Sequence, residues 1–154
     1  MISSNDKAAI STTKVIADLT MNGYNVYVPM GEYNNPFDLL IHKEKQILKI
    51  EVKYLSCNRP VPKETLLYTP KGSDTKKKAY KTGDFDYFAI YLAEVDKIIY
   101  PSITFKGKII RSTVPNASTK FYWYEDFFTF TDIATKTTRA SLGFAPYKRK
   151  RKTT

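Results

Sequence analysis

Residues 36–54, PFDLLIHKEKQILKIEVKY, constrain the fold of this chain more than any other stretch. Apolar and polar residues alternate on both sides of the charged segment KEKQ. Alternation with a period of two predicts half-buried β-strands, and the short charged interruption predicts a hairpin between them. If Glu44 and Lys45 form the centre of the turn, Asp38 lies opposite Glu51 and on the same face as Lys53.

Two carboxylates that face each other across a strand pair repel. Such a pair is retained when positive charge lies between the carboxylates, and that charge is either a lysine or a metal ion. Mg²⁺ takes one or two carboxylates and completes its shell with water and substrate phosphate. Asp38 and Glu51 are therefore candidate ligands, and Lys53 is a candidate partner of the phosphate. The alternative is that these residues form surface ion pairs, which contribute little to stability.

The length and charge of the chain indicate its organisation and its partner. A chain of 154 residues is typical of one domain with its own core. We expect the folded domain to cover residues 1–146, and residues 147–154 to form a flexible basic tail. The formal net charge of +10 predicts a polyanionic partner. Nucleic acid is the leading candidate, and an anionic membrane surface is the alternative.

The residue types present argue against several classes of function. The chain has one cysteine, Cys57, and one histidine, His42. These are too few ligands for a His/Cys zinc site, and they give poor support for a Ser-His or Cys-His hydrolase. A single cysteine forms no internal disulfide, so we expect a reducing compartment. No apolar run is long enough to span a bilayer, and the first residues lack a signal-peptide core. We therefore expect a soluble, cytoplasmic protein.

The residues before the hairpin predict a helix and a strand. A helix capped by Asn5 or Asp6 is expected to end at Gly23, and its apolar stripe is suited to packing on a sheet. A strand is expected at 24–29, with Val28 on its apolar face. A helix, a strand and a hairpin in this order predict an α/β fold.

The residues after the hairpin predict more strands. A short strand is expected at 64–68, a buried strand at 87–92 and a returning strand at 98–100. Residues 103–110 are expected to form a further hairpin arm around a Lys-Gly turn.

Two basic segments are candidate contacts for the phosphates of DNA. Each is either a clamp on the DNA backbone or a solvated, solubilising segment. The candidate DNA-binding residues are Lys71, Lys76, Lys77, Lys78 and Lys81 in the first segment and Lys148, Arg149, Lys150 and Arg151 in the tail. The aromatic segment at 121–130, FYWYEDFFTF, is interpreted as core or as an oligomer interface rather than as a base-stacking platform.

Four sequence blocks occur in an order that resembles a known family. They are GYNVYVPMG at 23–31, FDLL at 37–40, IEVK at 50–53 and DYFAIY at 86–91. Together they resemble the PD-(D/E)XK nuclease superfamily, and in particular its compact group I intron homing endonucleases. The resemblance extends over residues 7–101, about two-thirds of the chain. Any one block alone is weakly specific for this family. The four blocks together, in this order, are more specific.

The resemblance implies a fold and a role for each site residue. It implies an α/β, restriction-endonuclease-like core with a mixed β-sheet flanked by helices. Asp38 matches the central metal-binding aspartate, Glu51 the second acidic position and Lys53 the catalytic lysine. The backbone carbonyl of Val52 would be a further metal ligand. The implied cofactor is Mg²⁺, with Mn²⁺ as a substitute.

The chain departs from the family pattern at Thr12. The family often carries a glutamate in its first helix, in a stretch like E-x-K-V-I-A, and here residues 12–17 read TTKVIA. Threonine is a poorer metal ligand than a carboxylate and carries no charge. Three alternatives remain open: Asp38 and Glu51 suffice, another acid such as Glu32 reaches the site, or the chain is catalytically weakened.

The implied activity is that of a Mg²⁺-dependent endodeoxyribonuclease acting on double-stranded DNA, here a sequence-specific homing endonuclease. Because cutting both strands needs two sites, we expect a homodimer or a homotetramer. The alternatives are a DNA-binding protein of the same fold that has lost its chemistry and a four-way-junction resolvase. An RNA-binding or ribosome-associated basic protein would explain the charge but not the order of the blocks.

Overall fold

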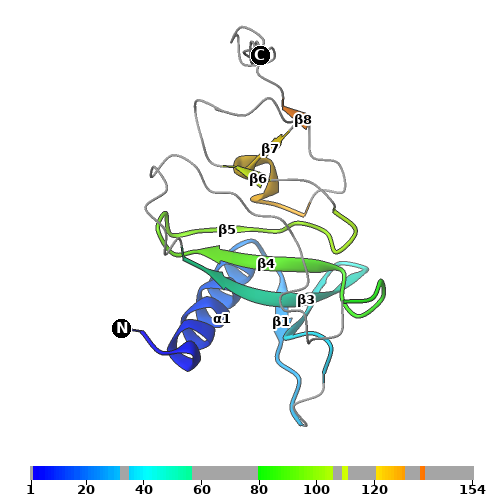
Figure 1. The fold of residues 1–154 in the computed structure, drawn as a ribbon. Coiled ribbons are helices and arrows are strands. Elements are labelled where there is room, and N and C mark those ends of the chain that lie inside the picture. Colours follow the sequence, from blue (N-terminus) through cyan, green and yellow to red (C-terminus); the bar gives the residue numbers. More distant parts are fainter. Residues whose placement is uncertain are drawn as a thin grey trace, which may run out of the picture.

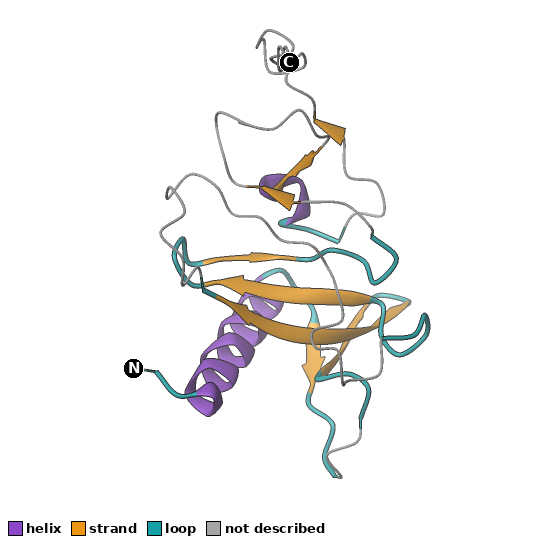
Figure 2. Ribbon diagram, viewed as in Figure 1, coloured by secondary structure: helices purple, strands orange, loops and turns teal. Residues whose placement is uncertain are grey.

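The computed structural model describes residues 2–31, 35–56, 80–105, 109–110, 121–130 and 136–137. They form a larger sheet with a helix packed on it, and a smaller sheet beyond the β5 edge of the larger one (Figures 1 and 2). The elements are α1 (Ser4–Met21), β1 (Asn25–Tyr27), β2 (Leu39–Lys43), β3 (Gln46–Leu55), β4 (Tyr87–Leu92), β5 (Lys97–Ile99), β6 (Ile109–Ile110), β7 (Phe121–Trp123), the 3₁₀ helix η1 (Tyr124–Phe127) and β8 (Lys136–Thr137).

Local hydrogen bonds define both ends of α1. Ser3 caps the helix: its hydroxyl accepts from the backbone N–H of Asp6, whose carboxylate accepts from the backbone N–H of Ser3. The predicted cap at Asn5 or Asp6 is therefore wrong, because Asp6 serves as the third helical residue of this capping box. Gly23 ends the helix as predicted, with φ of 83°, a left-handed conformation that glycine adopts without steric cost.

The larger sheet has the order β1-β2-β3-β4-β5 and is mixed, as predicted. The β3–β4 pair is parallel, and the other neighbouring pairs are antiparallel. In the central hairpin Leu39 faces Ile50 and Lys43 faces Gln46, so the turn is centred on Glu44 and Lys45 and the predicted register is confirmed.

The remaining strand predictions agree with the structure to different degrees. The strand at 87–92 is confirmed as β4, and the predicted returning strand differs from β5 by one residue at each end. β1 is shorter than predicted, and Val28 lies outside it with 56% of its surface exposed. The predicted hairpin arm at 103–110 is wrong: Ile103 is not in a strand, and β6 pairs in parallel with β7 of the smaller sheet.

The core has a layer on each face of the larger sheet. On one face Val15 and Leu19 of α1 pack against Leu39, Ile41 and other buried residues of β2, β3 and β4. On the opposite face a second buried group gathers Phe85, Phe88, Ile90, Leu92, Ile99 and Phe127. Each fully buried side chain of this size contributes about 1.5–3 kcal/mol, so the two layers fix the sheet from both sides.

The aromatic segment at 121–130 contributes to both layers of the core. Phe127 is buried, and its backbone carbonyl accepts a hydrogen bond from the N–H of Tyr100 at 2.7 Å. Phe128 packs against the second layer, and Phe130 packs against the first. For these three residues the core interpretation is confirmed.

Some predictions fall on parts of the chain that the structure leaves undescribed. The expected strand at 64–68, the domain boundary at 146 and the basic tail at 147–154 lie outside the described residues, as does Glu32. Within the described ranges, no helix combines the length and the apolar character that crossing a membrane requires.

Candidate active site

β3 continues past the end of β2 and leaves one of its edges open. The β2–β3 pairing stops at Leu39 and Ile50, whereas β3 runs on to Leu55. Asp38 occupies the start of this open edge. Its backbone N–H donates to the carbonyl of Ile50 at 2.9 Å, and its Oδ2 accepts from the backbone N–H of Val52 at 2.8 Å. The exposed carboxylate of Asp38 thus accepts the hydrogen bond from Val52 that a backbone carbonyl of a neighbouring strand would otherwise accept.

The carbonyl of Val52 lies on the same edge as Asp38. In a strand, the N–H and the C=O of one residue point to the same side. The N–H of Val52 donates to Asp38, whereas the carbonyl of Lys49 accepts from Asp86 next to β4. The even-numbered residues of this part of β3 therefore direct their backbone groups away from β4. The carbonyl oxygen of Val52 is placed beside the Asp38 carboxylate.

A lysine and a tyrosine bind the carboxylate of Glu51. Nζ of Lys53 donates to Oε1 of Glu51, and the hydroxyl of Tyr80 donates to the same oxygen at 3.1 Å. Nζ of Lys53 also lies over the ring of Tyr80, 5.4 Å from its centroid. We call Glu51, Lys53 and Tyr80 the Glu51 cluster.

Burial and charge shift the pKa values of this cluster. Desolvation raises the pKa of the Glu51 carboxyl, and the negative charge of Asp38 adds to the rise, although the hydrogen bonds from Lys53 and Tyr80 oppose it. Desolvation pulls the pKa of the Lys53 ammonium down, but the bonds with Glu51 and Tyr80 outweigh it, and the pKa is raised. Lys53 therefore stays charged at neutral pH.

An open pocket of about 480 Å³ collects the predicted site residues. Thr12, Asp38, Glu51, Val52 and Lys53 all line this pocket. One stripe of α1 forms the opposite wall, in which Ser4, Lys7, Ala8, Ser11 and Thr12 recur at helical spacing. The helix position where the family often carries a glutamate thus faces the same space as the two carboxylates.

The oxygen donors of the pocket suit a hard divalent cation. Among the residues described, no three acidic, histidine or cysteine side chains are grouped so as to hold a metal ion. The site offers instead the carboxylates of Asp38 and Glu51 and the carbonyl of Val52. Mg²⁺ accepts such a set because it keeps several waters and binds substrate phosphate.

Several residues of this region were not among the predicted site residues, including Tyr80, which binds Glu51, and Lys7, which carries a charge. Tyr80 reaches Glu51 from a remote part of the chain, and no local pattern marks it. Lys7 also lines the pocket, with Nζ 5.8 Å from the centroid of the Tyr54 ring. Lys7 lies one helical turn before Ser11, which also lines the pocket, but no sequence pattern marked either residue.

The structure describes only one of the predicted DNA-binding residues. Lys81 is exposed and directly follows Tyr80 in the chain. The other eight lie outside the described residues: Lys71, Lys76, Lys77, Lys78, Lys148, Arg149, Lys150 and Arg151.

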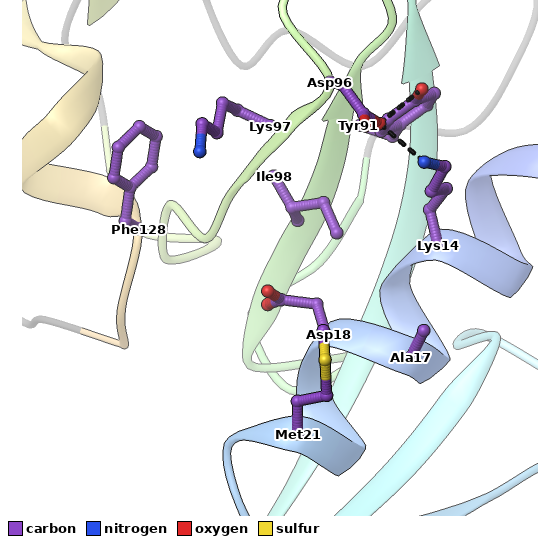
Figure 3. A pocket seen from close by; sticks show the side chains of 9 residues that line it. All are labelled: Lys14, Ala17, Asp18, Met21, Tyr91, Asp96, Lys97, Ile98 and Phe128. Carbon is purple, nitrogen blue, oxygen red and sulfur yellow. Dashed lines mark hydrogen bonds and ion pairs between the residues drawn. The ribbon is translucent and has the colours of Figure 1, made fainter.

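A second pocket, of about 360 Å³, lies between α1 and the β4–β5 edge of the sheet (Figure 3). Oδ1 of Asp96 lies 2.8 Å from Nζ of Lys14 and 2.9 Å from the hydroxyl of Tyr91. We call these three residues the Asp96 cluster. The hydrogen bond from Lys14, followed by that from Tyr91, lowers the pKa of the Asp96 carboxyl. The other carboxylate of this pocket, Asp18, accepts a hydrogen bond from the hydroxyl of Tyr100.

The mixed sheet and the acidic, lysine-bearing strand edge agree with the nuclease type predicted from the sequence blocks. The model of the PD-(D/E)XK endonuclease family matches residues 2–130, and the chain belongs to this family. Among solved structures, the chain is similar to the bacterial homing endonuclease I-Ssp6803I. The TM-score is 0.56 at 19% identity, over 74% of this chain and 85% of that chain. This likeness confirms the predicted α/β, restriction-endonuclease-like fold class. No curated protein sequence matches the chain.

Proposed function

We propose that this protein is a Mg²⁺-dependent endonuclease that hydrolyses phosphodiester bonds of double-stranded DNA at the open edge of β3. One observation carries the proposal: Asp38, Glu51 and Lys53 line a single pocket. Membership of the endonuclease family supports the reaction class. The net charge of +10 supports a polyanionic substrate.

Each side chain of the pocket has a distinct role in this proposal. Asp38, Glu51 and the carbonyl of Val52 would hold the Mg²⁺ ion. When bound, Mg²⁺ lowers the pKa of water and neutralises charge on the phosphate. Lys53 donates to the phosphate oxygens and stabilises the charge that develops on them. The raised pKa of Lys53 keeps this donor positive throughout the neutral range.

DNA reaches the pocket along its exposed rim. Asp38 is exposed, so a phosphate can approach its carboxylate from solvent. Lys7 lines the same pocket and forms no ion pair with any residue that the structure describes, which leaves its charge for a phosphate. Lys81 and the other predicted basic residues would extend the contact along the backbone.

Within the endonucleases, we favour a sequence-specific homing endonuclease that works as a homodimer or a homotetramer. The order of the four sequence blocks supports this subtype, and so does the similarity to a bacterial homing endonuclease. The requirement for two sites in a double-strand cut supports the oligomer. Thr12 favours a second candidate, a DNA-binding protein of the same fold with weakened chemistry, because it brings no carboxylate to the pocket.

Cleavage of a plasmid library tests the proposal. We expect the wild-type chain to cut in Mg²⁺ or Mn²⁺ and not in EDTA, and Asp38→Ala and Lys53→Ala to abolish cutting. Equal activity of the three proteins would defeat the site assignment. DNA binding without cutting in either metal would support the weakened protein, and a preference for branched DNA of any sequence would support a junction resolvase.

Thr12 can be tested against its neighbour on the helix. We expect Thr12→Glu to preserve or raise the cleavage rate, because the new carboxylate would face the pocket. Thr13 is exposed and is not among the residues that line this pocket, so Thr13→Glu adds the same charge outside it. A rise that is equal in the two variants would show that position 12 has no special relation to the site.

A further inference from the structure

Tyr80 reaches the candidate active site from outside the two strands that build it. It lies 29 positions from Glu51 along the chain, and its hydroxyl donates to Oε1 of that residue at 3.1 Å. The same ring lies beneath the ammonium of Lys53. Tyr80 thus contacts both members of the Glu51–Lys53 pair. Its hydroxyl donates to Glu51 and also helps to raise the pKa of Lys53, and its π face lies against the Lys53 ammonium.

Neighbouring aromatic rings fix the position of Tyr80. Its ring packs edge to face against Phe85, with centroids 5.1 Å apart, and against Phe88, with centroids 5.6 Å apart. Phe85 and Phe88 are buried and contact each other in the same manner. Because a tyrosine side chain has few rotatable bonds, these contacts determine where its hydroxyl lies.

Both donors of the Glu51 cluster bind one oxygen of the carboxylate. Lys53 and Tyr80 donate to Oε1, and no donor among the described residues binds Oε2. Two donors on one oxygen favour a single orientation of the carboxylate, in which Oε2 is bound by neither Lys53 nor Tyr80. A lysine alone would leave the orientation less determined, because its side chain is long and flexible.

We infer that Tyr80 is a positioning residue of the active site. Its hydroxyl orients the Glu51 carboxylate so that Oε2 is available to the cation, and its ring holds the ammonium of Lys53 beside the phosphate site. This inference rests on the proposed function, in which Glu51 binds the cation. Groups that orient a metal ligand commonly affect metal affinity or activity by about 10- to 100-fold.

Tyr91 provides a matched control for Tyr80. Its hydroxyl also donates to a carboxylate, that of Asp96, and Lys14 lies over its ring. The Asp96 cluster lies at the second pocket, away from Asp38. Tyr80→Phe and Tyr91→Phe each remove one hydroxyl and one hydrogen bond to a carboxylate while keeping the ring.

The test compares the two variants with the wild-type chain in four measurements. These are Mn²⁺ affinity by calorimetry without DNA, the single-turnover cleavage rate in Mg²⁺, DNA affinity in EDTA, and the melting temperature. We expect Tyr80→Phe to weaken Mn²⁺ binding and slow cleavage by about 10- to 100-fold, with DNA affinity unchanged. Tyr91→Phe is expected to keep wild-type values for Mn²⁺ and cleavage, whatever its melting temperature.

A further variant separates the ring from the hydroxyl. Tyr80→Leu removes both, so it is expected to cleave more slowly than Tyr80→Phe because Lys53 loses the ring beneath it. If Tyr80→Phe binds Mn²⁺ and cleaves DNA as the wild-type chain does, the inference about Tyr80 is wrong, but the proposed function stands. Equal losses of Mn²⁺ affinity and cleavage in Tyr80→Phe and Tyr91→Phe would have the same meaning. A wild-type chain that neither binds Mn²⁺ nor cuts DNA would overturn the proposed function, and the inference with it.

Discussion

The described part of the molecule contains the same three residue types in two places, each beside a pocket that residues of α1 line. The Glu51 cluster and the Asp96 cluster each join a carboxylate, a lysine and a tyrosine. In each, the lysine and the tyrosine donate to one carboxylate oxygen. The lysine lies over the tyrosine ring in both, at 5.4 Å from the centroid for Lys53 and 5.8 Å for Lys14.

The two clusters differ in the burial of the acid and in the charges around it. The side chain of Glu51 is 12% exposed, whereas that of Asp96 is 63% exposed. The charge of Asp38 acts on Glu51 and raises its pKa together with desolvation. The charges of Lys14 and Lys97 act on Asp96 and help to lower its pKa. The same types of hydrogen-bond partner thus occur in a surface ion pair at one place and in the proposed cation site at the other.

The largest expected effect separates the two lysines. Lys53→Ala is expected to reduce single-turnover cleavage by about 10²–10³-fold, because it removes a fixed positive donor from the phosphate site. Lys14→Ala also removes a lysine that contacts a carboxylate and a tyrosine ring. This variant is expected to keep the cleavage rate within about twofold of the wild-type rate. Equal losses in the two variants would show that the clusters are functionally alike.

A smaller effect is expected on DNA binding. Lys7 and Lys14 lie on one helix, each with Nζ 5.8 Å from a tyrosine centroid, but Lys14 is paired with Asp96. We expect Lys7→Ala to reduce the slope of log affinity against log salt by about 1. Lys14→Ala is expected to leave the slope unchanged. Anisotropy titrations in EDTA at several salt concentrations measure both, and identical slopes for the two variants would exclude Lys7 as a phosphate contact.

The smallest effect concerns the pH dependence of stability without metal. The pKa of Glu51 is raised above its ordinary value of 4.5, so the folded chain keeps a proton that the unfolded chain has lost. The stability of wild type relative to Glu51→Gln should therefore fall as the pH rises above 4.5. The pKa of Asp96 is lowered from 3.8, so the stability relative to Asp96→Asn should fall as the pH drops below 3.8. Denaturant unfolding in EDTA across this pH range gives the free energy of unfolding of the wild-type chain relative to each variant. If the two differences changed with pH in the same direction, the pKa values of Glu51 and Asp96 would not be shifted in opposite directions.

Parts of the fold and of the site are local enough to be predicted from the sequence. The period-two alternation and the position of the charged turn determine the β2–β3 register, because a shift by one residue would turn the apolar side chains to solvent. The register in turn brings Asp38 to the strand edge at Val52. The resemblance of residues 12–17 to the family's first-helix stretch then indicated Thr12, which lines the same pocket.

Other features depend on contacts between remote segments and have no local signal. The parallel β3–β4 pair and the contact of Tyr80 with Glu51 both require the chain to cross over between them. The pairing of β6 with β7 depends in the same way on residues far along the chain. The helix cap was mispredicted for a different reason: Ser3, Asn5 and Asp6 are all good capping residues, and only the reciprocal bonds between Ser3 and Asp6 decide among them.

The most direct measurement is Mn²⁺ binding by calorimetry to three proteins: the wild-type chain, Asp38→Asn and Asp96→Asn. The two variants each remove one carboxylate charge, the first at the open edge of β3 and the second at the other pocket. We predict that Asp38→Asn loses Mn²⁺ binding and that Asp96→Asn binds Mn²⁺ as the wild-type chain does. Binding that survives in Asp38→Asn, or that is lost equally in both variants, would contradict a cation site at the strand edge.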